Sequence, residues 1–395
     1  MSWNALAQYA VFLLIVTTLV RPVGWYMAKV FSGQRTFFDP ILRPVEKMLH
    51  RITGVNPKRE MTWKEYASCF TIFGGVGTLF LYVLLRVQRW LPWFYPATMA
   101  TPMTPDLAMN TAISFATTTT WQAYGGETTM SYASQMAGLC VQNFLAGAAG
   151  LAVGVAFVRG LARNCASTLG NFWVDLVRSL LWVLLPLSLL GALTLVWQGV
   201  PMNFRPHARV HSLEGAQQVI AQGPVAALES IKNLGTNGGG FFNVNGAHPY
   251  ENPTPLSNLL EMLALAVLPA AFTYTYGTMI GRRRQGWLLY WVMVVLFVSG
   301  LLGCGWAEQR GNPLLANQVD ARRGAMQPGG NMEGKEVRFG ISSSVLTAVV
   351  TSNGATGSYN SQHDSYMPRG AWCRWSICCW AKWSLAGWAL DYTAC

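Results

Sequence analysis

The sequence predicts an all-α membrane protein whose chain crosses the bilayer several times. Of the 395 residues, 52% are hydrophobic and only 11% are charged, whereas soluble domains carry about 25% charged residues. Six apolar stretches each approach the ~20 residues that a helix needs to cross the hydrocarbon. Between them, three short helix candidates are each followed by a polar run of Gly, Thr and Asn. These features exclude a disordered chain, a coiled coil and a soluble enzyme.

The apolar stretches are expected to form spanning helices. They cover residues 5–31, 66–85, 131–158, 176–197, 259–280 and 287–306. The first stretch could be a signal peptide, but no small-residue cleavage site follows it, so a retained span is the better interpretation. Residues 91–106 are expected to form a Pro-rich loop.

The basic residues predict the orientation. They cluster in 32–64, at Arg159 and Arg163, and in 282–284, and these clusters share one side if all six spans cross. Basic loops are enriched on the cytoplasmic side, which places the N-terminus outside. Three long loops then lie outside as well, at 86–130, 198–258 and 307–365. The net charge of +11 is explained in this way and does not indicate a nucleic-acid partner.

The three outer loops contain an internal repeat. The segments 106–132, 224–258 and 338–365 each consist of about ten residues of helix followed by TTTT, TNGGG or TSNGATG. Repeats of this kind indicate one structural unit used several times. The unit is a span, a short helix, a polar Gly/Thr stretch and a second span.

The repeated unit is suited to binding an alkali cation. A short helix that ends inside the membrane directs its C-terminal carbonyls, with roughly half a negative charge, at the midplane. Glycine permits backbone conformations closed to other residues, and rings of carbonyls can replace the hydration shell of the ion. Ordinary extracellular turns are the alternative, but three copies in register favour a cation site. The TNGGG run is not a nucleotide loop, because no Lys-Ser/Thr follows its glycines.

Several of these motifs carry a resemblance to a known family. TNGGGFFNVNGAHPYENPTPLSN closely resembles the second filter region of the KdpA family, the potassium-binding subunits of the Kdp potassium-transporting ATPase. SFATTTTWQAYGGETTMSYASQMAGL is similar to the first filter region, and AVVTSNGATGSYNSQHDS to the third. NMEGKEVRFG at 331–340 and GNPLL at 311–315 also match, and the resemblance is collinear to about Met367.

The resemblance implies a fold and a function. The family fold has about ten spans and four such repeats around one pore, and it is related to potassium channels. Potassium enters from outside and moves sideways through an intramembrane tunnel to a partner subunit that hydrolyses ATP. The complex also contains small accessory subunits and lies in the bacterial inner membrane. The KdpA subunit itself is not catalytic and needs no cofactor or transition metal. An autonomous potassium channel is the alternative transport function.

The candidate potassium ligands follow by position from the family motifs. They are Thr118, Thr119 and Thr120 in the first filter, Thr236, Asn237 and Gly238 in the second, and Ala355, Thr356 and Gly357 in the third, with Gln122, Gly239 and Asp364 nearby. The first filter departs from the family pattern, because TTTTWQ stands where the family has TNTNWQ. Two amides become hydroxyls, and we expect altered affinity rather than loss. Asp364 either attracts cations to the outer mouth through its charge or belongs to a surface turn.

The chain therefore divides into five predicted parts, with about two and a half of the family's four repeats. These are the first span and basic loop at 1–64, repeat 1 at 65–160, repeat 2 at 172–284, an incomplete repeat 3 at 285–367, and an unrelated tail at 368–395.

The tail has an unusual composition that indicates a shifted reading frame. It holds five Trp and four Cys in 28 residues. A zinc or disulfide site at Cys373, Cys378, Cys379 and Cys395 is the weaker alternative. Back-translation with permitted codons, followed by insertion of one T at the codon for Arg369, yields GEVVFGGVGAGLYG, a stretch that the family carries after its third filter. A chain with this tail would lack the fourth repeat and leave backbone polar groups facing lipid, each at a cost of several kcal/mol. We expect such a chain to be unstable and inactive.

The frameshift hypothesis predicts the result of resequencing the genomic DNA across codons 360–400. A restored base should bring GEVVFGGVG into frame. A confirmed deletion should accompany failure to support growth at limiting potassium. An intact frame that still encodes the Trp- and Cys-rich tail, in cells that grow at limiting potassium, would contradict the hypothesis.

Overall fold

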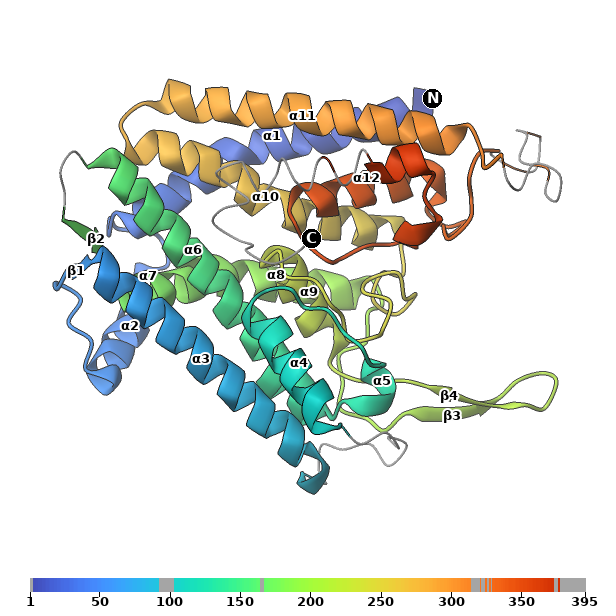
Figure 1. Cartoon of the computed structure of the whole chain (residues 1–395), viewed down its shortest axis with the longest axis horizontal. Coiled ribbons are helices and arrows are strands. Elements are labelled where there is room, and N and C mark those ends of the chain that lie inside the picture. The colour runs from blue at the N-terminus through green and yellow to red at the C-terminus, as the bar shows by residue number, and fades with distance from the viewer. Residues whose placement is uncertain are drawn as a thin grey trace.

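Six long apolar helices form the frame of the computed structural model (Figure 1). The structure describes residues 3–91, 103–163, 167–313, 320, 324, 327, 329–372 and 376. Within these residues, the helices long and apolar enough to cross a membrane are Trp3–Phe31, Trp63–Trp90, Ser134–Ala162, Phe172–Trp197, Pro255–Met279 and Arg283–Gln309. The prediction of an all-α polytopic protein is confirmed.

The helices follow one another in a simple order, with short strands between some of them. The helices are α1 (Trp3–Phe31), α2 (Asp39–Thr53), α3 (Trp63–Val87), η1 (Gln88–Trp90), α4 (Pro105–Ala116), α5 (Gly126–Thr129), η3 (Ser134–Cys140), α6 (Val141–Ala162), α7 (Phe172–Arg178), η4 (Ser179–Leu184), α8 (Leu185–Trp197), α9 (Val225–Leu234), α10 (Pro255–Met279), α11 (Arg283–Gln309), α12 (Gly340–Asn353) and η5 (His363–Ser365). The strands are β1 (Met61–Thr62), β2 (Thr168–Gly170), β3 (Ala208–His211) and β4 (Gln217–Ile220).

The strands form two small antiparallel pairs. In the first, Met61 of β1 lies opposite Gly170 of β2. This strand pair connects the start of α3 to the start of α7. The second is the hairpin β3–β4, in which Ala208 lies opposite Ile220. The hairpin projects from the helical body (Figure 1).

Local capping explains where two of the long helices begin. The Thr62 hydroxyl accepts the Glu65 N–H, and the Glu65 carboxylate accepts the Thr62 N–H, which forms a capping box before α3. Thr254 and Ser257 form the same box before α10. Each box satisfies two backbone donors that the first helical turn leaves free.

A proline explains the π-helical segment η4, which lies within the fourth span. Pro186 has no N–H to donate to the carbonyl four residues earlier, that of Trp182. The Tyr26 hydroxyl donates to this carbonyl at 2.7 Å. The hydrogen bond therefore joins α1 to η4 at the place where the α-helical ladder is interrupted.

Glycines allow the spanning helices to approach closely. A Cβ built on Gly24 of α1 would lie 2.5 Å from the carbonyl oxygen of Ala271 on α10. The Thr275 hydroxyl donates to the Gly24 carbonyl at 3.0 Å across the same interface. Gly277 and Gly286 make a similar approach between α10 and α11, where a Cβ on Gly277 would lie 2.9 Å from the Gly286 Cα. Small residues of this kind are typical of helix interfaces in membranes.

Segments that are predicted to share one side of the membrane lie at the same end of the structure. The N-terminus, the hairpin β3–β4 and the segments around α12 lie at one end in Figure 1, and α2, β1 and β2 lie at the other. Which end faces the cytoplasm stays a prediction. Most of the predicted Pro-rich loop at 91–106 and of the tail at 368–395 lies outside the described residues, and only Pro368–Trp372 and Ser376 of the tail are described, as helix.

A buried ion pair connects several helices at the end of the structure that holds α2, β1 and β2. Arg159 on α6 contacts both carboxylate oxygens of Asp175 on α7, and the Nη2–Oδ1 distance is 2.8 Å. The Asp175 side chain is 1% exposed and that of Arg159 is 12% exposed. Arg159 also donates to the Phe31 carbonyl at the end of α1, and the Tyr66 hydroxyl donates to Asp175. The pair therefore connects α1, α3, α6 and α7.

Replacement of Asp175 by Ala should lower the free energy of unfolding by about 3–5 kcal/mol, because it leaves the Arg159 charge buried without its partner. Thermal unfolding of the purified protein in detergent micelles would measure the loss. Glu60→Ala provides the matched control, since the Glu60–Arg163 pair is 46% and 39% exposed and exposed pairs contribute about 0–1 kcal/mol. Equal losses in the two variants would contradict this account.

Candidate functional site

Three short helices end with the same backbone geometry. The C-cap residues of α4, α9 and α12 are Thr117, Gly235 and Gly354. The N–H of each C-cap donates to the carbonyl four residues earlier, at distances of 2.8–2.9 Å. We name the three residues after each C-cap filter segments 1, 2 and 3, which are residues 118–120, 236–238 and 355–357. The structure thus repeats the plan that the sequence repeats.

The filter segments hold most of the unusual backbone conformations in the described chain. Of the described non-glycine residues, Thr118, Thr120, Thr236, Ala355 and Asn245 have φ between 50° and 62°. Four of these five belong to the filter segments, and the first residue of every segment is among them. Left-handed φ is strained for a β-branched residue, at about 1–3 kcal/mol per residue, and such strain concentrates at functional sites.

Hydrogen bonds to the short helices fix these conformations. The Asn237 N–H donates to the Lys232 carbonyl at 3.0 Å, and the Thr356 N–H donates to the Thr351 carbonyl at 2.8 Å. In segment 1, the Thr120 N–H donates to the Ser114 carbonyl at 3.0 Å. Each N–H is thereby directed back toward its own helix.

The carbonyls of the same peptides point the other way. The N–H and C=O groups of a trans peptide are antiparallel, so the carbonyls of Thr119, Thr236 and Ala355 point away from their short helices. The helix C-termini add their partial negative charge on the same side. An arrangement of neutral oxygens with negative helix ends is suited to a cation that prefers oxygen ligands.

The three segments meet at one place. A Cβ built on Gly238 would lie 2.6 Å from the Cα of Gly357 and 2.8 Å from Oγ1 of Thr120. The Thr120 hydroxyl donates to the Asn237 carbonyl at 3.0 Å, and the Gly357 N–H approaches the same oxygen at 3.4 Å. Residues more than a hundred positions apart in the sequence are therefore in direct contact.

Gln122 connects the first and second repeats just beyond the filter segments. Its Oε1 accepts the Gly240 N–H at 2.9 Å, and its Nε2 donates to the Gly240 carbonyl at 2.9 Å. Nε2 also donates to the Tyr124 hydroxyl at 3.0 Å. The Gln122 side chain is buried, and its amide pairs with both the N–H and the C=O of one residue, Gly240, as a neighbouring strand would.

The loop that follows segment 2 is fixed to the third repeat and to a carboxylate. The Tyr359 N–H donates to the Asn245 carbonyl at 3.0 Å, and the Asn245 amide donates to the Tyr359 hydroxyl at 2.9 Å. The buried Glu251 carboxylate accepts the N–H groups of Phe242 and Gly246 at 3.0 and 2.8 Å. The Asn245–Tyr359 bonds hold the chain after segment 2 against the chain after segment 3, and Glu251 fixes the loop after segment 2 internally.

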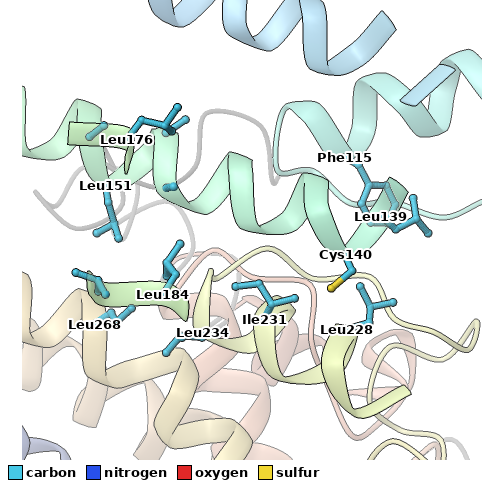
Figure 2. Packing of buried hydrophobic residues seen from close by; sticks show 14 of the residues in the cluster. Phe115, Leu139, Cys140, Leu151, Leu176, Leu184, Leu228, Ile231, Leu234 and Leu268 are labelled. Carbon is cyan, nitrogen blue, oxygen red and sulfur yellow. The ribbon is translucent and has the colours of Figure 1, made fainter. Parts of the chain in front are cut away.

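Nine of the ten residues of the short helix α9 are buried. Leu228, Ile231 and Leu234 contact the apolar side chains of the surrounding helices, as Figure 2 shows. The remaining face carries an ion pair in which Lys232 Nζ lies 2.6 Å from Glu229 Oε2, with both side chains 0% exposed. The two residues are three positions apart on the helix, a spacing at which oppositely charged side chains can pair. The pair leaves α9 electrically balanced apart from its backbone dipole.

A third buried ion pair, between Glu308 and Lys335, supports the third repeat. Glu308 at the end of α11 lies 2.8 Å from Lys335 and accepts the Asn331 amide at 2.8 Å. Its other carboxylate oxygen accepts the Met367 N–H at 2.8 Å. Glu308 therefore connects the motif NMEGKE to the chain that follows segment 3.

The structure brings together the residues predicted for the filter, with one exception. Gly239 lies against segment 1, since a Cβ on it would be 3.1 Å from the Thr120 carbonyl oxygen. Asp364, by contrast, is exposed on η5. Among the described residues, no group of three or more His, Cys, Asp or Glu side chains is placed to hold a metal ion.

Some supporting residues were not predicted from the sequence. Glu308 and Lys335 had no assigned role, although Lys335 lies inside a motif that carries the family resemblance. Glu251, Asn245 and Tyr359 also lie in quoted motifs. A charged residue inside an otherwise polar and Gly-rich motif was the available signal, but the sequence does not identify the partner.

Comparison with known proteins gives consistent matches. A family model described as KdpA, potassium-transporting ATPase A subunit, matches residues 10–378, which extends past Met367. A relative from Koribacter versatilis is 49% identical over 387 residues, which cover 94% of this chain and 65% of the relative. Relatives from Rhodospirillum centenum and Solibacter usitatus are each 51% identical over 370 residues, with 63% and 64% of their length covered. All three are named potassium-transporting ATPase potassium-binding subunits.

Replacement of Gln122 by Met should destabilise the contact between the first two repeats. The buried N–H and C=O groups of Gly240 would lose their partner, at about 1–3 kcal/mol for each unsatisfied group. Thermal unfolding in detergent would measure the change. Gln217→Met is the control, because Gln217 is exposed on β4. A Gln122 variant as stable as this control would show that the amide does not hold the segments together.

Proposed function

This chain belongs to the KdpA family, and from that premise we propose that it binds potassium where filter segments 1, 2 and 3 meet. The proposed ligands are oxygens of Thr118, Thr119 and Thr120, of Thr236, Asn237 and Gly238, and of Ala355, Thr356 and Gly357. Gln122 and Gly239 support the segments from behind. Asp364 is proposed to raise the local concentration of cations near the outer surface.

One observation carries the proposal. Three helix C-termini lead into strained segments whose N–H groups bond back to the helices, so the peptide carbonyls of Thr119, Thr236 and Ala355 point away from them. Oxygen dipoles in this arrangement substitute for the water around a desolvated alkali ion. The helix dipoles add favourable interaction with positive charge and disfavour anions.

The wider role rests on the relatives. The chain spans about 63–65% of the length of the relatives described above. We propose that it acts as a non-catalytic subunit in the bacterial inner membrane, with the N-terminus outside. It would pass potassium through an intramembrane tunnel to an ATP-hydrolysing subunit, with small accessory subunits in the same complex. The division into the parts 1–64, 65–160, 172–284, 285–367 and 368–395 belongs to the same proposal.

Two other functions make different predictions. An autonomous potassium channel would conduct the ion in lipid vesicles without an ATPase partner. A non-functional product of the proposed frameshift would bind no potassium at all. Our proposal requires binding by the chain itself and transport only together with the ATPase subunit.

Potassium should therefore stabilise the purified chain against heat. A ligand that binds only the folded state at 100 times its dissociation constant stabilises it by about 2.7 kcal/mol. Thermal unfolding in detergent with potassium chloride, and with sodium or choline chloride at equal ionic strength, would measure this effect. Rubidium uptake into vesicles containing the chain alone should be absent.

A matched variant tests where the ion binds. Gly238→Ala should remove the potassium effect, because its Cβ would collide with the Gly357 backbone. Gly199→Ala is the control, since Gly199 has a similar positive φ and a Cβ built on it would meet no heavy atom within 4 Å. Equal stabilisation by all three salts would contradict the proposal, and rubidium uptake by the chain alone would favour the channel.

A further inference from the structure

Thr120 makes a contact that bears directly on the proposed ligands. Its hydroxyl belongs to segment 1, but it donates to the carbonyl of Asn237, the middle residue of segment 2, at 3.0 Å. The two residues are 117 positions apart in the sequence. A side chain of the first repeat therefore donates a hydrogen bond to a backbone carbonyl oxygen of the second.

The Asn237 oxygen has a second donor as well. The Gly357 N–H from segment 3 lies 3.4 Å from it. A carbonyl oxygen has two lone pairs, so the two donors occupy the positions from which this oxygen would bind a cation. The Thr120 hydroxyl is the closer donor and the one that a side-chain substitution can remove.

The surroundings hold the Thr120 hydroxyl in this place. Thr120 is 1% exposed, and its N–H donates to the Ser114 carbonyl of α4 at 3.0 Å. Gly238 lies against Oγ1, with room for no side chain. A buried hydroxyl without a partner costs free energy, so the hydroxyl remains on the Asn237 oxygen.

We propose that Thr120 lowers the affinity of this protein for potassium because its hydroxyl competes with the ion for the Asn237 carbonyl. This inference rests on the proposed function, since it assumes that segment 2 supplies ligands. It assigns a direction to the effect of the TTTT sequence: the threonine weakens binding, and removal of its hydroxyl strengthens binding. The Thr120 hydroxyl acts through the Asn237 carbonyl and sets the affinity, whereas the oxygen of Thr120 proposed as a ligand is that of its backbone carbonyl.

Thr118 provides the matched comparison. It also departs from the family pattern, has φ 62° against 50° for Thr120, and is largely buried. Its hydroxyl donates to the carbonyl of Thr117, the C-cap of α4, at 2.6 Å. Loss of this hydroxyl leaves the Asn237 oxygen unchanged, so Thr118 separates the proposed competition from a general effect of altering segment 1.

The first experiment compares potassium binding by the purified full chain and four variants. Thr120→Val keeps a β-branched side chain and removes the hydroxyl, and Thr120→Ala is a second such variant in case valine prevents folding. Both should bind potassium about two- to tenfold more tightly, the change expected for one net hydrogen bond. Thr120→Ser retains the hydroxyl, and Thr118→Val removes a hydroxyl that does not contact the Asn237 oxygen. Neither variant should therefore bind potassium more tightly than the parent chain. Isothermal titration with potassium chloride, against sodium chloride, measures the dissociation constants.

The second experiment observes the Asn237 carbonyl without any potassium. Labelling of asparagine carbonyls with ¹³C and glycine nitrogens with ¹⁵N selects Asn–Gly peptides by NMR, and the sequence has three, which begin at Asn237, Asn245 and Asn353. In Thr120→Val, the carbonyl signal of Asn237 should shift as the hydrogen bond is lost. The signals of Asn245 and Asn353 should not shift.

The outcomes separate this inference from the proposed function. Unchanged or weaker potassium binding in both Thr120→Val and Thr120→Ala, with binding intact in the parent chain, would overturn the inference. An Asn237 signal that does not shift would overturn it independently. Absence of potassium binding in the parent chain and in every variant would reject the proposed function, and the inference about affinity with it. In that case the Asn237 signal still reports whether the hydroxyl occupies the carbonyl.

Discussion

The site depends on the need to satisfy the backbone donors of non-helical chain inside a membrane protein. Water is not available there, so each N–H needs a protein acceptor. The N–H groups of Thr120, Asn237 and Thr356 find acceptors in the last turns of α4, α9 and α12. The strained φ angles follow from this requirement, and so does the direction of the carbonyls. One set of hydrogen bonds thus determines both the strain and the chemistry of the site.

The surrounding helices convert this local requirement into a fixed position. Leu228, Ile231 and Leu234 bury α9 among apolar neighbours, and small residues such as Gly24 let the long helices approach closely. Polar side chains then connect the repeats to each other, as Gln122 does with Gly240. The apolar contacts bring the segments near one another, and these amide and hydroxyl contacts fix their relative register.

The sequence predicted the fold better than it predicted the contacts of the site. Spanning helices are local features of length and apolarity, and the repeated short helices are recognisable by their pattern, so both were predictable. The bond between Gln122 and Gly240 joins residues 118 positions apart, and nothing in either local sequence identifies the other. The left-handed conformations of Thr118 and Thr120 contradict the preference of threonine. The bond from the Thr120 N–H to α4 and the contact of its hydroxyl with segment 2 fix this part of the chain, and the conformational preference of threonine alone could not reveal either.

The burial of α9 has a consequence for how the protein is made. Its ten residues are too few to cross a bilayer, and Glu229 and Lys232 make its entry into lipid as an isolated segment costly. The helix can therefore reach its place only after α6 and α8 have been inserted and present a protein surface to receive it. Biogenesis must then proceed in two stages, with the spanning helices delivered first and the short helix folded in afterwards. Chaperones or proteases at the membrane would meet the chain in the interval between these stages.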